Sequence, residues 1–570
     1  MKHTLAVLSL AALTTLSLPA SSGKNNNTVA ALDKGDAIFP MEGNRGIDVE
    51  HYDLNITWDA VSGRIQVVDT MKIRSTDTLS RFSLDLHGLT VDYVEIDDKA
   101  VDFMREGDKL LITPSKPIGK GSVFGVSVRY HGVPDPIKES VTGGWVKRGD
   151  GVIAVNEPIS AKNWYPCNNL PIDKATYAFH ITVPKGFDVV SNGKPSAPIE
   201  TNGTLSYTFS PKAPITSYGT MVHIGHFNEE NLTTQSGIPL YNYYEQGVDA
   251  KAKSVFAKQE EILDYFASLF GAYPFATAGV VVMKEQSALA YETQTRATFG
   301  AGTSEQKFAH ELAHQWFGDA VSITDWKETW LKEGFATYAA ALWMAHRDRD
   351  YMKQWVKGSY ESMMGIAHYP KKNLKELFGF FEIKERKMSK AEVKALIDLG
   401  MHGKSDFKEM KNALALIPKE GISNYQLDAV LAKVSFDHFA LTFKQAQRFN
   451  EIVSGKKIND PRSFEEIVAV LAKAPRSVSS LEEIYGGGTY TRGALALHAL
   501  HLKVGDKTFF KILRTYLKRY MNGNADSNDF IAVAQKVSGE NLQTFFKGWL
   551  EDTLIPDMPE YGLFFKNYSL

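Results

Sequence analysis

The residues with the clearest chemistry are two histidines and two glutamates in the middle of the chain. His310-Glu311-Leu312-Ala313-His314 is followed, after 18 further residues, by Glu333. On a helix, residues i and i+4 share one face, so both imidazoles can reach a single metal ion. Two histidines, one carboxylate and an open position for water are typical of a hydrolytic zinc site. The sequence therefore predicts one Zn²⁺ ion, held by His310, His314 and Glu333.

Glu311 follows the first predicted ligand, where its carboxylate can take a proton from a metal-bound water. The alternative is a surface helix with two solvated histidines, in a chain that has 15 histidines. A buried helix is favoured instead by the apolar residues around the motif, which are Phe308, Leu312, Trp316 and Phe317. The segment TWLKEGFATYAA predicts a second helix that carries Glu333.

Composition excludes some classes of partner. A chain of 570 residues is long enough for two to four domains. A net charge of −2 and a pI near 6.8 imply no polyanion partner, and no basic stripe predicts nucleic-acid binding. Cys167 is the only cysteine, so no intrachain disulfide can form, and we expect a small buried filler.

The first residues are typical of a secretory signal. Lys2 and His3 precede an apolar stretch from Leu5 to Leu18, and Ala20-Ser21-Ser22 offers small residues for cleavage. The apolar stretch is short for a membrane span, although an uncleaved anchor stays an alternative. No cysteine lies near the cleavage site, so a lipoprotein is not predicted. We expect an exported protein, periplasmic or secreted, with a signal peptide at 1–22 and a flexible leader at 23–45.

Four segments with different periodicity are expected to position these residues. Short alternating runs over 46–246 predict antiparallel strands in a sandwich-like domain. Helical patterns over 247–379 surround a short strand, AGVVVMKE, and carry the metal motif. Residues 380–483 predict a helical insertion in which Ser389 and Glu392 form a capping box, and 484–570 predict the closing helices.

Five motifs together resemble the gluzincin zinc aminopeptidases, the family of aminopeptidase N and leukotriene hydrolase. In chain order they are NEPISAKNWYPCNNLPIDKATY, SALAYETQT, HELAHQWFGD, WLKEGFA and TYTRGALALHAL. The resemblance implies an α+β multidomain fold, with an N-terminal antiparallel β saddle and a thermolysin-like α/β metallopeptidase domain. It also implies a zinc-dependent aminopeptidase that hydrolyses the N-terminal residue from peptides through a metal-activated water.

The resemblance implies roles for three further residues. Glu292 matches the glutamate that holds the free α-amine of the substrate, and Glu157 falls where a second residue helps to hold it. Tyr490 matches the tyrosine whose hydroxyl stabilises the oxyanion, with Tyr485 as a competitor. Asp319 is either a helix-end residue or a support for a zinc ligand. The strand around Glu292 departs from the family pattern at Leu289, Tyr291 and Thr293, so no side-chain preference follows.

Three alternative functions can be compared with the aminopeptidase prediction by the residues that each would need. A thermolysin-like endopeptidase would share the zinc residues but would not need Glu292. A binding protein with vestigial chemistry would have lost Glu311 or Tyr490, and both are present. Epoxide hydrolysis, known for one branch of the family, has no independent support in the sequence. The insertion at 380–483 is either a helical lid over the site or a surface elaboration.

Overall fold

The computed structural model describes residues 35–138, 140–287, 290–363, 367–370, 374, 383–400, 407–434, 438–441, 443–455, 474–552 and 554–564. The predicted signal peptide (1–22) and the first part of the predicted leader (23–34) lie outside the described residues. No helix in the described part of the chain is both long enough and apolar enough to cross a membrane.

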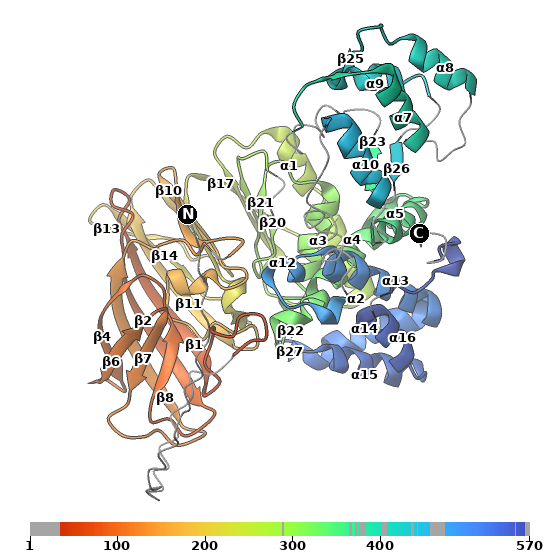
Figure 1. The fold of residues 1–570 in the computed structure, drawn as a ribbon. Coiled ribbons are helices and arrows are strands. Elements are labelled where there is room, and N and C mark those ends of the chain that lie inside the picture. The colour runs from red at the N-terminus through yellow and green to blue at the C-terminus, as the bar shows by residue number, and fades with distance from the viewer. Residues whose placement is uncertain are drawn as a thin grey trace, which may run out of the picture.

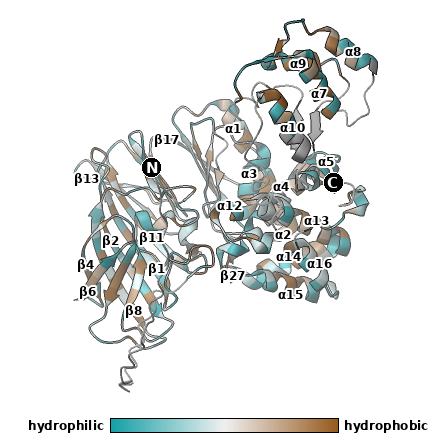
Figure 2. Cartoon of the chain, in the orientation of Figure 1, coloured by the Kyte–Doolittle hydropathy of each residue, from teal (hydrophilic) through white to brown (hydrophobic). Residues whose placement is uncertain are grey.

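The N-terminal part of the chain is almost entirely β structure, as its alternating pattern predicts (Figure 1). Along β2 every second side chain is buried, and the intervening ones are exposed except for the half-buried Val68. Figure 2 shows hydrophobic and hydrophilic residues interspersed along these strands. The elements are β1 (Ile47–Trp58), β2 (Ile65–Ser75), β3 (Phe82–Asp85), β4 (Thr90–Ile96), β5 (Lys99–Ala100), β6 (Asp102–Glu106), β7 (Lys109–Thr113), β8 (Val123–Gly132), β9 (Gly144–Arg148), β10 (Gly151–Val155), η1 (Ser160–Asn163), β11 (Lys174–Pro184), β12 (Asp188–Ser191), β13 (Ile199–Thr201), β14 (Thr204–Phe209), β15 (Ile215–Thr216), η2 (Ser217–Gly219) and β16 (Met221–Gly225).

These strands form three sheets. The largest has the order β13-β14-β11-β1-β2-β8-β4-β5, with β15 also paired to β11, and smaller sheets have the orders β12-β16-β10-β9 and β3-β7-β6. The predicted antiparallel arrangement is wrong for one pair, because β1 and β11 are parallel in the register His51 to Thr176. Parallel neighbours need a long connection, and the strands from β2 to β10 supply it.

The next segment combines a mixed sheet with the helices that carry the metal motif. The helical pattern near 250–270 forms two helices, which are separated at Ala257-Lys258. The sheet has the order β17-β18-β19-β21-β20, so the short β20 lies at its edge. The elements are β17 (Phe227–Thr233), β18 (Pro239–Glu245), α1 (Ala250–Phe256), α2 (Gln259–Phe270), β19 (Val280–Met283), β20 (Ala290–Tyr291), β21 (Ala297–Gly300), α3 (Glu305–His314), β22 (Ser322–Ile323), η3 (Trp326–Glu328), α4 (Trp330–Arg347) and α5 (Tyr351–Met363).

The closing helices pack on α4 and complete the same hydrophobic core. They approach α4 closely at Gly334 and Gly493, where a Cβ added to Gly334 would lie 3.0 Å from the Gly493 carbonyl carbon. The elements are η5 (Pro475–Ser477), α12 (Leu481–Ile484), η6 (Gly488–Arg492), which is a π-helical turn, α13 (Gly493–Val504), α14 (Asp506–Tyr520), β27 (Asn524–Ala525), α15 (Ser527–Ser538), α16 (Gln543–Leu550) and η7 (Pro559–Tyr561).

The segment between α5 and η5 has a small core of its own and lies above α5 in Figure 1, away from the N-terminal sheets. Its described residues are mainly helical, as predicted, and the backbone amide of Ser389 donates to Glu392 Oε2 at 2.7 Å, as the capping box requires. It also contains two short antiparallel pairs, β23 with β26 and β24 with β25, which the sequence did not predict. The elements are β23 (Ala367–Pro370), β24 (Lys387–Met388), α7 (Lys390–Gly400), α8 (Phe407–Ala415), β25 (Ile422–Ser423), η4 (Asn424–Gln426), α9 (Leu427–Leu431), β26 (His438–Leu441) and α10 (Phe443–Ser454).

Candidate active site

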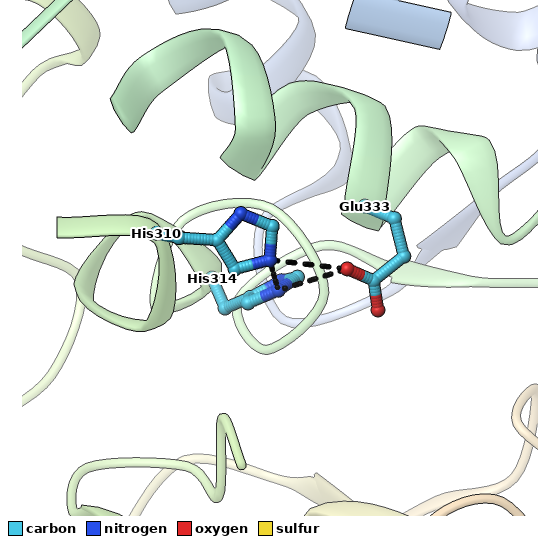
Figure 3. A group of neighbouring side chains, drawn as sticks. All are labelled: His310, His314 and Glu333. Carbon is cyan, nitrogen blue, oxygen red and sulfur yellow. Dashed lines mark hydrogen bonds and ion pairs between the residues drawn. The ribbon is translucent and has the colours of Figure 1, made fainter. Parts of the chain in front are cut away.

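The three predicted metal ligands come together between α3 and the first turn of α4 (Figure 3). His310 Nε2 lies 3.1 Å from Glu333 Oε2, His314 Nε2 lies 3.4 Å from the same oxygen, and the two Nε2 atoms lie 3.1 Å apart. Helical periodicity places both histidines on one face of α3, and the side chain of Ser304 caps the helix by accepting from the Lys307 amide. The three donor atoms therefore face one point.

The donor set fits zinc. In a tetrahedron with bonds of 2.0–2.1 Å, neighbouring ligand atoms lie about 3.3 Å apart, and these three distances are close to that value. His314 Nδ1 lies 2.9 Å from the Phe317 carbonyl oxygen. Since a carbonyl only accepts, Nδ1 carries the proton, and the Nε2 lone pair is left for the metal. His310 Nδ1 has a weaker partner in the Thr337 hydroxyl, at 3.4 Å.

Glu311 is buried on the same helix and lines the cavity with the two histidines. Ligand atoms of Glu292, Glu311 and His314 all lie within 4.8 Å of one another. Burial, together with the nearby carboxylates of Glu292 and Glu333, raises the pKa of Glu311 to about 8, while His314 acts in the opposite direction. In the metal-free protein Glu311 therefore favours its protonated form.

Two predicted amine-binding carboxylates meet around one buried lysine. Glu157 follows β10 of the N-terminal sheets, Glu292 follows β20, and both surround the Lys332 ammonium of α4. Lys332 Nζ lies 2.5 Å from Glu157 Oε1 and 2.7 Å from Glu333 Oε1, and it also contacts Glu292 Oε1. The Lys332 side chain is fully buried. The sequence shows WLKEGFA, but the role of this lysine was missed because nothing in the local pattern links it to the two distant carboxylates.

Charges in this cluster shift one another's pKa values. Burial raises the pKa of Glu157 to about 8, helped by Glu292 and opposed by Lys332. Burial also opposes ionisation of Glu292 and Glu333, but Lys332 and His314 outweigh it and lower both pKa values. Burial lowers the pKa of His310. Without a metal, the negative charge therefore concentrates on Glu292 and Glu333, beside the two histidine rings.

Tyr490 reaches the metal ligands from the π-helical turn η6. Its ring stacks on that of His310, with centroids 6.0 Å apart and an interplanar angle of 12°. Burial, with Glu333 nearby, raises its pKa well above the ordinary value, so the hydroxyl keeps its proton and can donate a hydrogen bond. Tyr485 also lines the cavity, and its buried hydroxyl has no hydrogen-bond partner among the residues that the structure describes. Both candidate tyrosines therefore face the same space.

The cavity that joins these residues has a volume of about 510 Å³. All seven predicted site residues line it: His310, His314, Glu333, Glu311, Tyr490, Glu292 and Glu157. Asp319 lies outside this lining; its carboxylate accepts from Gln315 Nε2 at 2.8 Å. Cys167 is fully buried, as expected for a filler. The cavity also contains residues that the sequence did not single out, among them Gln306 and Lys307 of α3.

Two family models match the chain in order. One, described as the Peptidase M1 N-terminal domain, matches residues 48–218. The other, described as the Peptidase family M1 domain, matches residues 270–376 and 416–549 and so contains the metal motif. Together the matched residues make up more than two thirds of the chain.

Individual relatives are similar over parts of their length. A probable aminopeptidase 1 from Sulfurisphaera tokodaii is 28% identical over 315 residues, which are 52% of this chain and 38% of the relative. Aminopeptidase N from Streptomyces lividans is 23% identical over 402 residues, 66% of this chain and 35% of the relative. Human glutamyl aminopeptidase is 29% identical over 215 residues, 34% of this chain and 22% of the relative. The chain thus spans well under half the length of these relatives.

Solved structures share the fold over almost the whole chain. The M1 zinc metallopeptidase of Deinococcus radiodurans superposes with a TM-score of 0.69 at 24% identity, covering 92% of this chain and 98% of that protein. A variant of the same protein bound to a Tyr-Ser-Ala substrate also gives a TM-score of 0.69, covering 93% of this chain and 100% of that one. The mixed α/β architecture, with β-rich N-terminal sheets followed by the metal-bearing helices, is therefore that of the M1 zinc metallopeptidases.

Proposed function

The chain belongs to peptidase family M1, and from this premise we propose that it is a zinc-dependent aminopeptidase acting on peptides with a free N-terminus. The observation that carries the proposal is the buried ammonium of Lys332 between Glu157 and Glu292, beside the metal ligands. This arrangement supports the proposal, because carboxylates at these positions stabilise a positively charged amine next to the metal ligands. A substrate α-amine has the same charge and needs the same carboxylate partners.

Each residue then has a role in the proposed hydrolysis. His310, His314 and Glu333 would hold one zinc ion, which would supply the Lewis acidity needed to activate water and polarise the scissile carbonyl. Glu311 accepts the proton of the attacking water and returns it to the leaving amine. The Tyr490 hydroxyl donates a hydrogen bond to the oxygen on which negative charge develops.

Glu292, with Glu157, holds the substrate α-amine and thereby sets the site of cleavage. A carboxylate at a fixed distance from the metal ligands selects the peptide bond one residue from the N-terminus. Replacement of Glu292 by Ala is expected to raise KM for free-amine peptides by about tenfold or more, because a charge-assisted contact is lost. Steady-state kinetics measures this change, and Glu229→Ala, on the exposed face of β17, is a matched control.

The first experiment compares paired peptides, one free and one acetylated at the N-terminus, by mass spectrometry with and without a chelator. We expect stepwise loss of N-terminal residues from the free peptides only, and no cleavage when the metal is removed. Internal cuts in both members of a pair would instead support the endopeptidase alternative, in which Glu292 does not set the site of cleavage.

We also propose that the protein is exported, on the basis of residues 1–22 alone. Cleavage after the small residues Ala20-Ser21-Ser22 would give a mature chain that begins near residue 23. N-terminal sequencing of the protein isolated from its cells tests this, and a mature chain that retains Met1 or Lys2 would contradict it.

A further inference from the structure

One cation in the cavity has no place in the proposed mechanism. Lys307 lies on α3 and lines the cavity with its neighbours Ser304 and Gln306. Among the residues that the structure describes, it is the only lysine or arginine in that lining, and none of the ion pairs between described residues includes it. Glu311 lies four residues further along the helix, so Lys307 shares its face, and the charge of Lys307 lowers the pKa of Glu311.

Contacts between α3 and α4 define a direction along the cavity. His314 and His310 both contact Glu333, and His310 also contacts Thr337. Farther along, Glu305 at the start of α3 accepts from Trp343 Nε1 near the end of α4, at 3.0 Å. The two helices are therefore antiparallel, and positions nearer the start of α3 lie opposite positions nearer the end of α4. Lys307 and Ala340, which both line the cavity, belong to the part beyond the metal ligands.

The amine end lies at the opposite part of the cavity. Lys332, which contacts Glu157 and Glu292, immediately precedes Glu333 in the first turn of α4. His310 lies between this end and Lys307. With a rise of 1.5 Å per residue, Lys307 is about 4.5 Å from His310 and about 10 Å from His314 along the helix axis. A di- or tripeptide is roughly 7–10 Å long when extended.

We infer that Lys307 binds a carboxylate on the leaving-group side of the substrate, so that the site favours peptides with a negative charge just beyond the scissile bond. The inference rests on the proposed function. The carboxylate belongs either to the C-terminus of a di- or tripeptide or to an acidic side chain in the second residue. The hydroxyl of Ser304 and the amide of Gln306, in the same lining, supply neutral donors beside the ammonium.

Charge gives the inference its physical reason. The remaining ionisable side chains of the lining are four glutamates, two histidines and three tyrosines, and Lys332 is already paired with three of those glutamates. A substrate carboxylate in this cavity would be repelled by the glutamates unless a cation faced it. Lys307 is the cation available at the end remote from the amine.

The test uses dipeptides with the same N-terminal residue X, chosen as the residue that the protein removes fastest. X-Ala carries a C-terminal carboxylate, X-Ala amide carries none, and X-Glu amide carries one only in its second side chain. The zinc-loaded wild-type protein is compared with Lys307→Gln and with the matched control Lys327→Gln, an exposed lysine in η3 outside the cavity lining. kcat/KM is measured for each pair.

We expect Lys307→Gln to lower kcat/KM about fivefold more for X-Ala or X-Glu amide than for X-Ala amide, which carries no carboxylate, since a water-exposed ion pair has a modest strength. If kcat/KM falls for X-Ala alone, Lys307 binds the C-terminal carboxylate. If it falls for X-Glu amide, Lys307 binds the acidic side chain of the second residue. The ratio of kcat/KM for the charged peptide to kcat/KM for X-Ala amide should also fall at high salt in the wild type but not in Lys307→Gln.

Two outcomes would overturn the inference. If Lys307→Gln changes kcat/KM by the same factor for all three peptides, Lys307 meets no carboxylate. A loss confined to Glu-Ala amide, compared with Gln-Ala amide, would place Lys307 against the N-terminal side chain instead. Failure of the proposed function has a separate signature, because the wild type would then release X from neither X-Ala nor X-Ala amide.

Discussion

Glu311 is the residue on which the chemistry depends most directly. Its burial keeps a carboxylate within 4.8 Å of His314 and Glu292, and it is not itself one of the three converging ligands. A carboxylate beside the metal, rather than on it, is free to move a proton. Metal binding and proton transfer are therefore separable by substitution at this position.

Replacement of Glu311 by Gln is expected to lower turnover severely while zinc stays bound, because the amide has the same shape but cannot take the proton. The expected loss in kcat is about 10²–10⁴-fold. Metal analysis of the purified variant, together with kinetics on a free-amine dipeptide, checks both parts. Activity near that of the wild type would remove Glu311 from its proposed role.

Lys332 is expected to matter for stability as well as for the site. Replacement by Met leaves the carboxylates of Glu157, Glu292 and Glu333 buried without their cation, which costs about 3–5 kcal/mol of unfolding free energy. Denaturant unfolding measures the change, and Lys327→Met is the exposed control. Zinc should reduce the loss, since the ion pairs with Glu333. Equal stability of both variants would contradict this account.

At the scale of elements, the site depends on how α4 meets the start of α13. Gly334 and Gly493 allow the two backbones to approach without side chains between them. This contact holds η6 against α4, and η6 in turn places the Tyr490 ring on that of His310. A tyrosine more than 150 positions from the metal motif thus becomes part of the same cavity.

Replacement of Tyr490 by Phe tests this placement, with Tyr485→Phe as the matched comparison. We expect Tyr490→Phe to lower kcat by about 10²–10³-fold with little change in KM, because a donor to the developing oxyanion is lost. Tyr485→Phe should change kcat much less, since its ring is not stacked on a metal ligand in the described structure. A larger effect at Tyr485 would reverse the assignment.

Residues with a strong local pattern could be predicted from the sequence, and residues that depend on distant partners could not. The spacing of His310, His314 and Glu333 follows from helical geometry alone, and alternation along β2 fixes its buried face. Glu292, Glu157 and Tyr490 were found through family resemblance, and all three line the cavity. Lys332 and the parallel pairing of β1 with β11 depend on contacts across the chain, which no local period encodes.

At the scale of the whole molecule, the N-terminal sheets and the metal-bearing helices share polar contacts near the site. Lys174 of β11 donates to the Asp319 carbonyl oxygen at 2.7 Å, just beyond α3. Burial lowers the pKa of Lys174 to about 7, and the charge of Asp319 opposes this only in part. The charge of Lys174 in this contact therefore changes near pH 7, whereas an exposed lysine keeps its charge up to about pH 10.

Replacement of Lys174 by Met is expected to change the pH dependence of stability. Because the folded protein releases the Lys174 proton near pH 7 and the unfolded chain releases it near 10.5, the unfolded state binds more protons between these values. This lysine therefore destabilises the fold most below pH 7, and the penalty declines as the pH rises toward 10. In denaturant titrations, the unfolding free energy of the wild type should therefore rise relative to that of Lys174→Met as the pH increases from 7 to 10. A constant difference would contradict the lowered pKa.

The parallel pairing of β1 with β11 has a consequence for biosynthesis. His51 and Thr176 are hydrogen-bonded neighbours although 125 positions separate them along the chain. At about 5–20 residues per second, the ribosome needs roughly 6–25 seconds to deliver β11 after β1 has been made. During that interval β1 can pair with β2, while its other edge stays open to any extended strand nearby. One edge of β1 in the nascent chain therefore stays available for pairing with other strands until β11, the ninth strand after β2, has been synthesised.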